Sequence, residues 1–349
     1  MSADAFFQTV WYRSKPSWVS SLLLPLAWIF ACVVHVRRFA YSSGLARQRR
    51  LVRPVIVVGN ITVGGTGKTP VTIWLANRLA ARGRRVGIVL RGYGAKPASL
   101  PLVVDANTPW QSAGDEACVI AQATQAIVVV DPDRVRAAEK AIALGAEIVI
   151  SDDGLQHLRL GRDFELAVLD ATRGLGNARM LPAGPLREPE KRLSTVDVCV
   201  FMHRDAGAVK TDIISARSRS IHARAHLGEA RSLVGSASRV LSDFAGQRVH
   251  AVAGIGNPSA FFAMLRAAGV QVVEHSFPDH AVLARSDLDF SDDAPLLMTL
   301  KDAVKCRAFA DERMWEVHMD IAMDAQVSDH LIDEIDRIIV SHRSNPRST

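Results

Sequence analysis

The stretch GNITVGGTGKTP, from Gly59 to Pro70, constrains the fold of this 349-residue chain more than any other. It follows the apolar run VIVV and precedes a helix-like segment, and this strand–loop–helix order is the setting of a phosphate-binding loop. The glycines let backbone N–H groups turn toward phosphate oxygens, and the helix N-terminus adds partial positive charge. A plain Gly-rich turn is the alternative, which GGTGKT in this setting disfavours.

The loop departs from the common spelling G-x-x-x-x-G-K-[ST], because Thr62 stands where the first glycine is expected. The order GGxGK[ST] resembles a variant loop of ATPases and GTPases that often carries a lysine directly before the glycine pair. Those lysines commonly serve dimer-activated switches, so Val63 at this position favours a self-contained enzyme. Lys68 is predicted to reach the β- and γ-phosphates, and the Thr69 hydroxyl to hold Mg²⁺. The expected nucleotide-binding residues are Thr62, Val63, Gly64, Gly65, Thr66, Gly67, Lys68 and Thr69.

Short β-branched runs alternate with helix-length segments after the N-terminal region. Such alternation is typical of βαβ units, so we predict an α/β fold with a P-loop NTPase-type, mostly parallel sheet. A polar stretch interrupts the pattern, which then resumes and indicates a second, smaller α/β domain. The predicted strands are 55–58, 86–90, 127–130, 147–150, 165–170 and 197–202, and the predicted helices are Thr69–Arg82, Arg134–Leu144 and Ser259–Ala268.

These patterns divide the chain into five parts. The expected parts are an N-terminal membrane-associated helix with its basic flank (1–50), a P-loop core (51–203), a connection (204–245), a smaller C-terminal α/β domain (246–340) and a disordered tail (341–349). Four scattered cysteines form no CxxC pair, so they predict neither a disulfide framework nor a zinc site and fit a reducing compartment.

Residues 17–36 contain no Asp, Glu, Lys or Arg and are long enough to span a bilayer core. Trp11, Trp18 and Trp28 are of the type that favours a membrane interface, and a cluster of arginines follows the run. The positive-inside rule then puts the C-terminal bulk in the cytoplasm. Pro25 leaves open a kinked span or a segment lying in the membrane plane. A cleaved signal peptide or a buried helix of a soluble protein would also give a run of this kind.

Carboxylates follow a second predicted strand, EIVI, in the segment SDDGLQH. An acid at such a strand end reaches Mg²⁺ in P-loop sites, directly or through water. Two adjacent side chains point to different sides, so one of Asp152 and Asp153 is expected to face the metal, and Asp153 is favoured. A simple Asp-Gly turn is the alternative.

Further loops carry more candidates. Asp115 and Glu116 open a predicted helix, where an ordinary capping acid is the alternative. His280 lies in the loop FPDH, where a lone histidine more often has no role. Arg187, in GNARMLPAGPLREP, is a candidate phosphate clamp. The remaining candidates are Arg91 and Tyr93 in RGYG and Asn177 in the Arg187 segment.

Taken in order, GGTGKTP, RGYG, GDEA, SDDGLQH, GNARMLPAGPLREP, GIGNPSAFF, FPDH and KDAVK behind an apolar helix resemble the tetraacyldisaccharide 4'-kinase family, the lipid A kinases of Gram-negative bacteria. The resemblance runs from about residue 10 to about residue 320. The chain departs from it at Ala281, where a second His or an aromatic is frequent, and at Leu300, where an acid is frequent.

The resemblance implies transfer of the ATP γ-phosphate to the 4'-hydroxyl of a tetraacyldisaccharide 1-phosphate, forming lipid IVA, with Mg²⁺ as cofactor. It implies Asp115 as general base with His280 supporting it. Phosphoryl transfer needs charge neutralisation, so Lys68 and Arg187 are expected to act as catalytic cations. Glu116 is a candidate near Mg²⁺, and Arg91, Tyr93 and Asn177 are candidates near substrate, with the individual roles of Glu116, Arg91 and Tyr93 left open. The expected location is the cytoplasmic face of the bacterial inner membrane, among anionic lipids, with no nucleic acid and no obligate protein partner.

Two rival functions fit parts of the sequence. A membrane-docked ATPase or GTPase switch shares the loop and the basic anchor, but position 63 lacks the lysine and no N-K-x-D segment reads guanine. A nucleic-acid binder is suggested by the pI of about 9.4 alone, and the basic residues flank an apolar helix instead of aromatics on a sheet.

Overall fold

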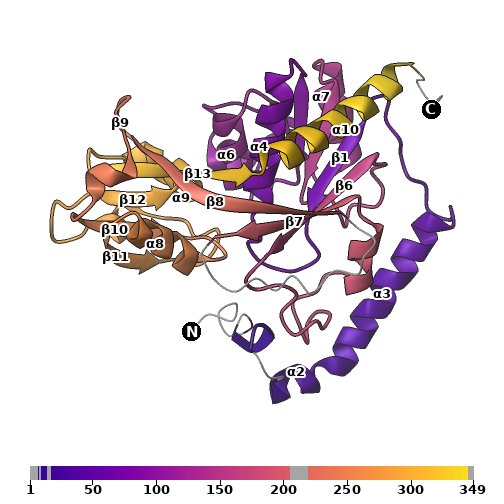
Figure 1. The fold of residues 1–349 in the computed structure, drawn as a ribbon, viewed down its shortest axis with the longest axis horizontal. Helices are drawn as coiled ribbons and strands as arrows, with labels where there is room; N and C mark the ends of the chain where they lie inside the picture. The colour runs from indigo at the N-terminus through magenta and orange to yellow at the C-terminus, as the bar shows by residue number, and fades with distance from the viewer. Residues whose placement is uncertain (1–6, 8, 14–16, 205–218, 345–349) are drawn as a thin grey trace.

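The computed structural model describes residues 7, 9–13, 17–204 and 219–344. One continuous sheet runs through both halves of the molecule, in the order β11-β10-β12-β13-β8-β7-β6-β1-β5-β2-β4-β3, with β9 paired to β8 (Figure 1). The strands of the first half are β1 (Val55–Gly59), β2 (Val86–Leu90), β3 (Leu102–Val104), β4 (Ile127–Val130), β5 (Ile148–Asp152), β6 (Phe164–Asp170) and β7 (Val198–His203). Those of the second half are β8 (Arg219–Ser232), β9 (Ser238–Arg239), β10 (Arg248–Ala253), β11 (Gln271–Ser276), β12 (Leu296–Thr299) and β13 (Met314–Met323).

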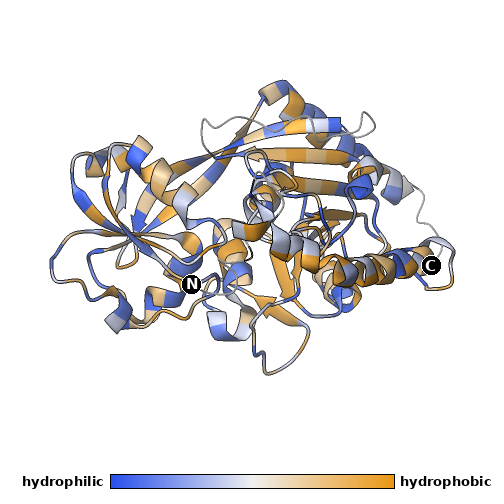
Figure 2. Ribbon diagram, turned by 90° about the horizontal axis from the view of Figure 1, so that it is seen from below, coloured by the Kyte–Doolittle hydropathy of each residue, from blue (hydrophilic) through white to orange (hydrophobic). Residues whose placement is uncertain are grey.

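Helices cover both faces of the first half of the sheet, here called the P-loop unit. The strands β1, β2 and β5 are buried on both faces, as their unbroken apolar runs require, and Figure 2 shows hydrophobic residues concentrated along the sheet. The α-helices after the N-terminal region are α4 (Lys68–Ala81), α5 (Trp110–Ala113), α6 (Asp115–Ala123), α7 (Arg134–Ala143), α8 (Pro258–Ala267), α9 (Leu300–Cys306) and α10 (Ala325–Ser344). The 3₁₀ turns are η1 (Glu190–Thr195), η3 (Leu241–Phe244), η4 (Arg285–Leu288) and η5 (Arg307–Phe309).

The predicted α/β fold is confirmed, and each predicted strand and helix is present with bounds within two residues. Within the segment 204–245, expected as a connection, β8 is a 14-residue strand that pairs in parallel with β7 and antiparallel with β13. The C-terminal unit, from β8 to β13, therefore shares hydrogen-bonded strands with the P-loop unit. The bounds of the five predicted parts stay a prediction, and residues 205–218 lie outside the described residues.

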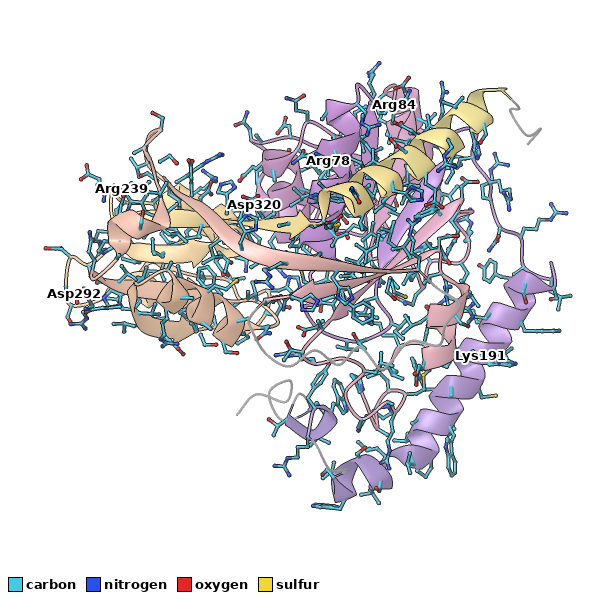
Figure 3. The ribbon with its side chains drawn as sticks, in the orientation of Figure 1. Arg78, Arg84, Lys191, Arg239, Asp292 and Asp320 are labelled. Atoms are coloured by element: carbon cyan, nitrogen blue, oxygen red, sulfur yellow. The ribbon has the colours of Figure 1, made fainter. Side chains whose placement is uncertain are left out.

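The expectation of a disordered tail is wrong for residues 341–344, which continue α10. This helix buries Leu331, Ile332, Ile335 and Ile339 against the sheet and α4. Its outer edge forms ion pairs with α4 and the turn after it, and Arg78 and Arg84 lie beside α10 in Figure 3. The pairs are Arg78–Asp329 at 2.7 Å, Arg82–Asp333 at 2.8 Å and Arg84–Asp336 at 2.8 Å.

The N-terminal apolar run forms two helices, α2 (Trp18–Leu22) and α3 (Leu24–Ser42), with Pro25 in the first turn of α3. Proline is tolerated there because its missing N–H would have no helical partner. Among the described residues, α3 is the one helix long and apolar enough to cross a membrane. It runs along the outside of the P-loop unit (Figure 1). Its exposed apolar side chains are Leu26, Trp28, Ile29, Val33, Val36 and Phe39, continued on α2 by Trp18 and Leu22.

Trp11 corrects one expectation about the interface tryptophans. Trp18 and Trp28 are largely exposed, but Trp11 is buried. Its indole Nε1 donates a hydrogen bond to the carbonyl oxygen of Pro182, 3.0 Å away. Trp11 therefore anchors the loop 176–189 to the N-terminus because its N–H finds a buried acceptor there.

Candidate active site

The phosphate loop lies between β1 and α4, as the sequence predicts. Gly64 and Gly67 have φ values of 108° and 96°, which only glycine adopts readily, and Gly67 caps α4. The amide of Asn60 donates to the Thr66 hydroxyl at 3.1 Å and so ties the two sides of the loop. Thr69 lies in the first turn of α4.

The two adjacent acids of SDDGLQH have different surroundings. Asp152 ends β5, is buried, and accepts a hydrogen bond from the Thr72 hydroxyl at 2.8 Å. Burial, with a further contribution from Glu116, raises the pKa of Asp152 to about 6. This carboxyl therefore lacks enough positive charge around it in the protein alone.

Asp153 follows in a left-handed backbone conformation, with φ of 48°. Its carboxylate lies 3.6 Å from Lys68 Nζ and 3.1 Å from the Arg187 guanidinium. Burial would raise the pKa of Asp153, but Lys68 and Arg187 outweigh burial and lower it. A strained non-glycine residue at a strand end is frequent at functional sites, and here it brings Asp153 to both predicted catalytic cations.

Asp115 and His280 come together from opposite units. Asp115 is the first residue of α6 and is 4% exposed, and the Nδ1 of His280 lies 3.1 Å from its Oδ2. Burial alone would raise the pKa of Asp115, but the hydrogen bond from His280 and the charges of Lys301 and Lys305 lower it to about 2. His280 has φ of 61°, and the hydrogen bond to Asp115 raises the pKa of its imidazole.

The remaining predicted residues are Tyr93, Glu116 and Arg91, which lie near charged residues of the site, and Asn177, which does not. The Tyr93 ring lies against His280 with centroids 4.9 Å apart, and Glu116 lies 3.5 Å from Lys301 Nζ. Arg91 follows β2 and is exposed. Burial, with a smaller contribution from the charge of Arg91, lowers the pKa of the Arg134 guanidinium to about 10. Asn177 is elsewhere. Its amide donates to Ser20 Oγ and to the Ala183 carbonyl, so it braces its own loop against α2.

The two units touch directly beside the phosphate loop. A Cβ atom built on Gly256, in the loop before α8, would lie 2.7 Å from the backbone nitrogen of Gly65. Real Cβ contacts do not come this close, so only glycine fits at position 256 in this arrangement. The contact brings the segment GIGNP of the C-terminal unit against the phosphate loop.

This site combines a phosphate loop, a strand-end acid pair and a buried Asp–His pair. Comparison with known proteins shows the family to which the chain belongs. The model of the family described as tetraacyldisaccharide-1-P 4'-kinase matches residues 19–337. The chain belongs to this family. Tetraacyldisaccharide 4'-kinases of Stenotrophomonas maltophilia and Pseudomonas entomophila are each 46% identical to it, over 94% of this chain and 96% and 95% of theirs. A crystal structure of LpxK from Aquifex aeolicus in complex with ATP matches with a TM-score of 0.76 at 28% identity, covering 92% of this chain and 99% of that one.

Membership in the tetraacyldisaccharide 4'-kinase family fixes the activity. The chain transfers a phosphoryl group from ATP to the 4'-hydroxyl of tetraacyldisaccharide 1-phosphate in lipid A biosynthesis. The predicted function is confirmed, and the switch and nucleic-acid functions are not favoured.

Sequence reasoning missed three basic residues of this kinase site. Lys305 is buried between Asp115 Oδ2 and Asp302 Oδ1, 3.4 Å from each, and Lys301 Nζ lies 2.8 Å from Asp279. Both lie in KDAVK, four residues apart and thus on one face of α9. Arg134 is buried and donates to the Asp152 carbonyl at 2.8 Å, while its Nε and Nη1 have no hydrogen-bond partner among the described residues. The segment DPDR after β4 is the signal that could have pointed to it.

Proposed function

We propose that Asp115 orients the 4'-hydroxyl of the lipid and accepts its proton late in phosphoryl transfer. The observation that carries this is the buried Asp115 carboxylate, held by His280 and Lys305 at the junction of the two units. A carboxyl with a pKa of about 2 is a weak base toward a free alcohol. It suits a loose transition state, in which the hydroxyl becomes acidic only as its bond to phosphorus forms.

His280 acts through Asp115, because its imidazole fixes the direction of the carboxylate. Tyr93 in turn restrains the His280 ring, and Arg91, which follows β2, is a candidate contact for the anionic substrate. Asn177 supports the shape of the loop that carries Arg187. The assignments of His280 and Tyr93 follow from side-chain contacts across the two units.

Lys68 and Arg187 neutralise the charge that spreads over the transferring phosphoryl oxygens. Asp153 lies between them and keeps both cations near the phosphate loop. The loop residues 62–69 supply backbone N–H groups to the ATP phosphates. Positioning and charge neutralisation, more than covalent chemistry, are what this reaction needs.

The residues at the loop suit Mg²⁺. No group of three or more His, Cys, Asp or Glu side chains forms a metal cluster among the described residues. Mg²⁺ usually takes only one or two carboxylates and relies on substrate phosphates and water for the rest. Thr69, Asp152, Asp153 and Glu116 offer such oxygen ligands, and the raised pKa of Asp152 marks a carboxylate short of positive charge. Bound Mg²⁺, held by these residues, would supply positive charge that offsets the charge of the ATP phosphates.

The site of action we propose is the cytoplasmic face of the bacterial inner membrane. Supporting it are the exposed apolar side chains of α3 and the arginines that follow, which attract anionic lipid headgroups by about 1 kcal/mol each. One side of α3 is fixed to the P-loop unit by the Arg38–Glu188 pair, and the preceding helix by the Ser20 hydroxyl on the Ala183 carbonyl. Because both attachments place α3 against the side of the P-loop unit, we expect this helix to lie in the membrane plane.

The function is tested by phosphate transfer in mixed detergent–phospholipid micelles. Protein, Mg²⁺, γ-labelled ATP and tetraacyldisaccharide 1-phosphate are combined, and label is expected in the lipid. Lys68→Met should abolish the transfer, and Asp115→Asn should slow it by about 10²- to 10⁴-fold. Label found only as free phosphate, unchanged by lipid, would contradict the assignment and direct attention to a protein partner.

Membrane docking is tested separately by vesicle sedimentation. Trp28→Glu with Ile29→Glu should release the protein from vesicles that contain anionic lipid. Val240→Glu is the matched control, because Val240 is an exposed apolar residue on the C-terminal unit. Equal retention of both variants on the vesicles would remove α3 from the docking role.

A further inference from the structure

We propose that Arg38 and Glu188 are positioning residues. They link the contact between α3 and the P-loop unit to the phosphate loop. Nucleotide affinity and the attachment of α3 would then depend on each other. The proposal rests on the contacts of the protein alone and holds whether or not α3 enters a membrane.

A continuous chain of polar contacts joins the two places, here called the α3–loop chain. Arg38 Nη1 lies 2.5 Å from Glu188 Oε2, and the other oxygen, Oε1, accepts from the Gln156 amide at 2.8 Å. The same amide nitrogen donates to the Asn60 carbonyl at 2.9 Å. The side chain of Asn60 reaches the Thr66 hydroxyl, inside the phosphate loop.

Glu188 needs Arg38 as its counter-charge. The Glu188 side chain is 3% exposed. Its second basic neighbour, Arg192, lies 3.5 Å away and is engaged more closely by Glu165, at 2.5 Å. Removing one partner of a buried ion pair leaves a charge that must rearrange or take up a proton. Loss of Arg38 would therefore displace Glu188 together with the Gln156 amide that it holds.

The backbone gives the displacement a direct route to the catalytic groups. Residues 185–187 pair with residues 61–63. The Val63 N–H donates to Pro185 O at 2.8 Å, and the Arg187 N–H donates to Ile61 O at 2.6 Å. Glu188 follows Arg187, whose guanidinium meets Asp153. A shift at Glu188 thus reaches both the start of the phosphate loop and the clamp on Asp153.

Linkage makes the effect reciprocal. If attachment of α3 to the P-loop unit raises the affinity for nucleotide by some factor, bound nucleotide must raise the equilibrium constant for that attachment by the same factor. The link can therefore be observed from either end, and a purely local packing role for Arg38 would give no signal at the far end.

The first experiment compares Arg38→Met with Arg37→Met by calorimetric titration with ADP in detergent micelles. Arg37 is the adjacent, exposed residue of α3, and no ion pair of Arg37 is found among the described residues, so both variants lose the same charge. Arg38→Met should weaken ADP binding roughly 5- to 50-fold, in the range of ordinary coupling between sites. Arg37→Met should stay within about twofold, and Arg38→Lys should recover part of the loss.

Non-additivity separates a shared chain from two independent defects. Glu188→Gln should also weaken ADP binding, and the double variant should be no weaker than the more affected single variant. Thermal unfolding is measured alongside, and the ADP effect must appear in variants whose melting temperature is retained. Wild-type ADP affinity in a folded Arg38→Met variant would overturn the proposal.

The second experiment needs no engineered cysteine. Cys32 lies exposed on α3, whereas Cys118, Cys199 and Cys306 are buried, so an environment-sensitive thiol dye will label α3 selectively. Saturating ADP should change the emission of the dye in the wild-type protein and in Arg37→Met, and leave it unchanged in Arg38→Met. An unresponsive dye on the wild-type protein under saturating ADP would rule out the link.

Discussion

His280 Nδ1 lies 3.1 Å from Asp115 Oδ2, although 165 residues separate the two positions in the chain. One residue belongs to the P-loop unit and the other to the C-terminal unit, so their contact exists only when the units are close. The pair therefore reports the arrangement of the two units as well as the chemistry of the hydroxyl.

Asp115→Asn should lower kcat by about 10²- to 10⁴-fold, the range of a general base. The amide keeps the shape of the side chain but cannot take the proton of the 4'-hydroxyl. KM for ATP should change little, since Asp115 contacts His280 and Lys305 and not the phosphate loop. Steady-state kinetics measure both, with Asp293→Asn, an exposed acid, as the control. Near-normal kcat would remove Asp115 from the base role.

His280→Gln should lower stability in a pH-dependent way. Its hydrogen bond to Asp115 raises the pKa of His280 in the folded state. The charged pair then contributes in full below the unfolded pKa of about 6.5 and is lost as pH rises through the folded pKa. The difference in melting temperature from wild type should be largest near pH 6 and narrow at higher pH. His330→Gln, at an exposed position of α10, should show no such trend.

Asp152→Asn should stabilise the nucleotide-free protein at neutral pH. The folded pKa of about 6 exceeds the ordinary 3.8, so wild type loses stability as pH rises between these values. The loss in the free energy of unfolding is on the order of 1–3 kcal/mol. The Asp152→Asn variant does not undergo this loss, because its amide does not ionise. Thermal unfolding at about pH 4 and pH 7.5 tests this: the variant should gain only at the higher pH. Adding Mg²⁺ and ATP should stabilise wild type more than the variant, and the reverse order would contradict a metal-facing Asp152.

Gly256→Ala should lower kcat. The added Cβ would meet the Gly65 nitrogen at 2.7 Å, so the units must stay farther apart. His280 would then lose its contact with Asp115, and a misplacement of about 1 Å can cost roughly 100-fold in rate. Ser259→Ala, in the first turn of α8, removes an exposed hydroxyl and should be neutral. An unchanged kcat for Gly256→Ala would show that the contact at Gly65 is not needed for catalysis.

The sequence predicted the P-loop unit well because its strands are unbroken apolar runs and its loop has a distinctive glycine spacing. It carried no sign that β8 would join the two units, since the buried positions of that strand are mainly small alanines, such as Ala223 and Ala225, between polar residues. The helix α10 was missed although Leu331, Ile335 and Ile339 recur at helical spacing. The basic and polar residues at its end are typical of a disordered tail and mask that pattern.

The candidate site likewise contains residues that local sequence patterns predict and residues that they do not. Lys68, Asp153 and Arg187 were predicted from local motifs, and the structure brings them together. Pairing Asp115 with His280 came from the family resemblance, because no local pattern says which distant loops will meet. Buried charges such as Lys305 and Glu188 could not be foreseen. Their roles depend on partners that only the folded chain supplies.

The C-terminal unit is attached to the P-loop unit at both of its ends. It begins at β8, which pairs with β7, and it ends at β13. The next helix, α10, packs on α4 through the Arg78, Arg82 and Arg84 ion pairs. A body tethered at two points cannot swivel freely, so its movement reduces to bending about a line through the paired strands. His280 would move toward or away from Asp115 along a single arc. Opening of the site would then follow the same path as closing, in the opposite direction.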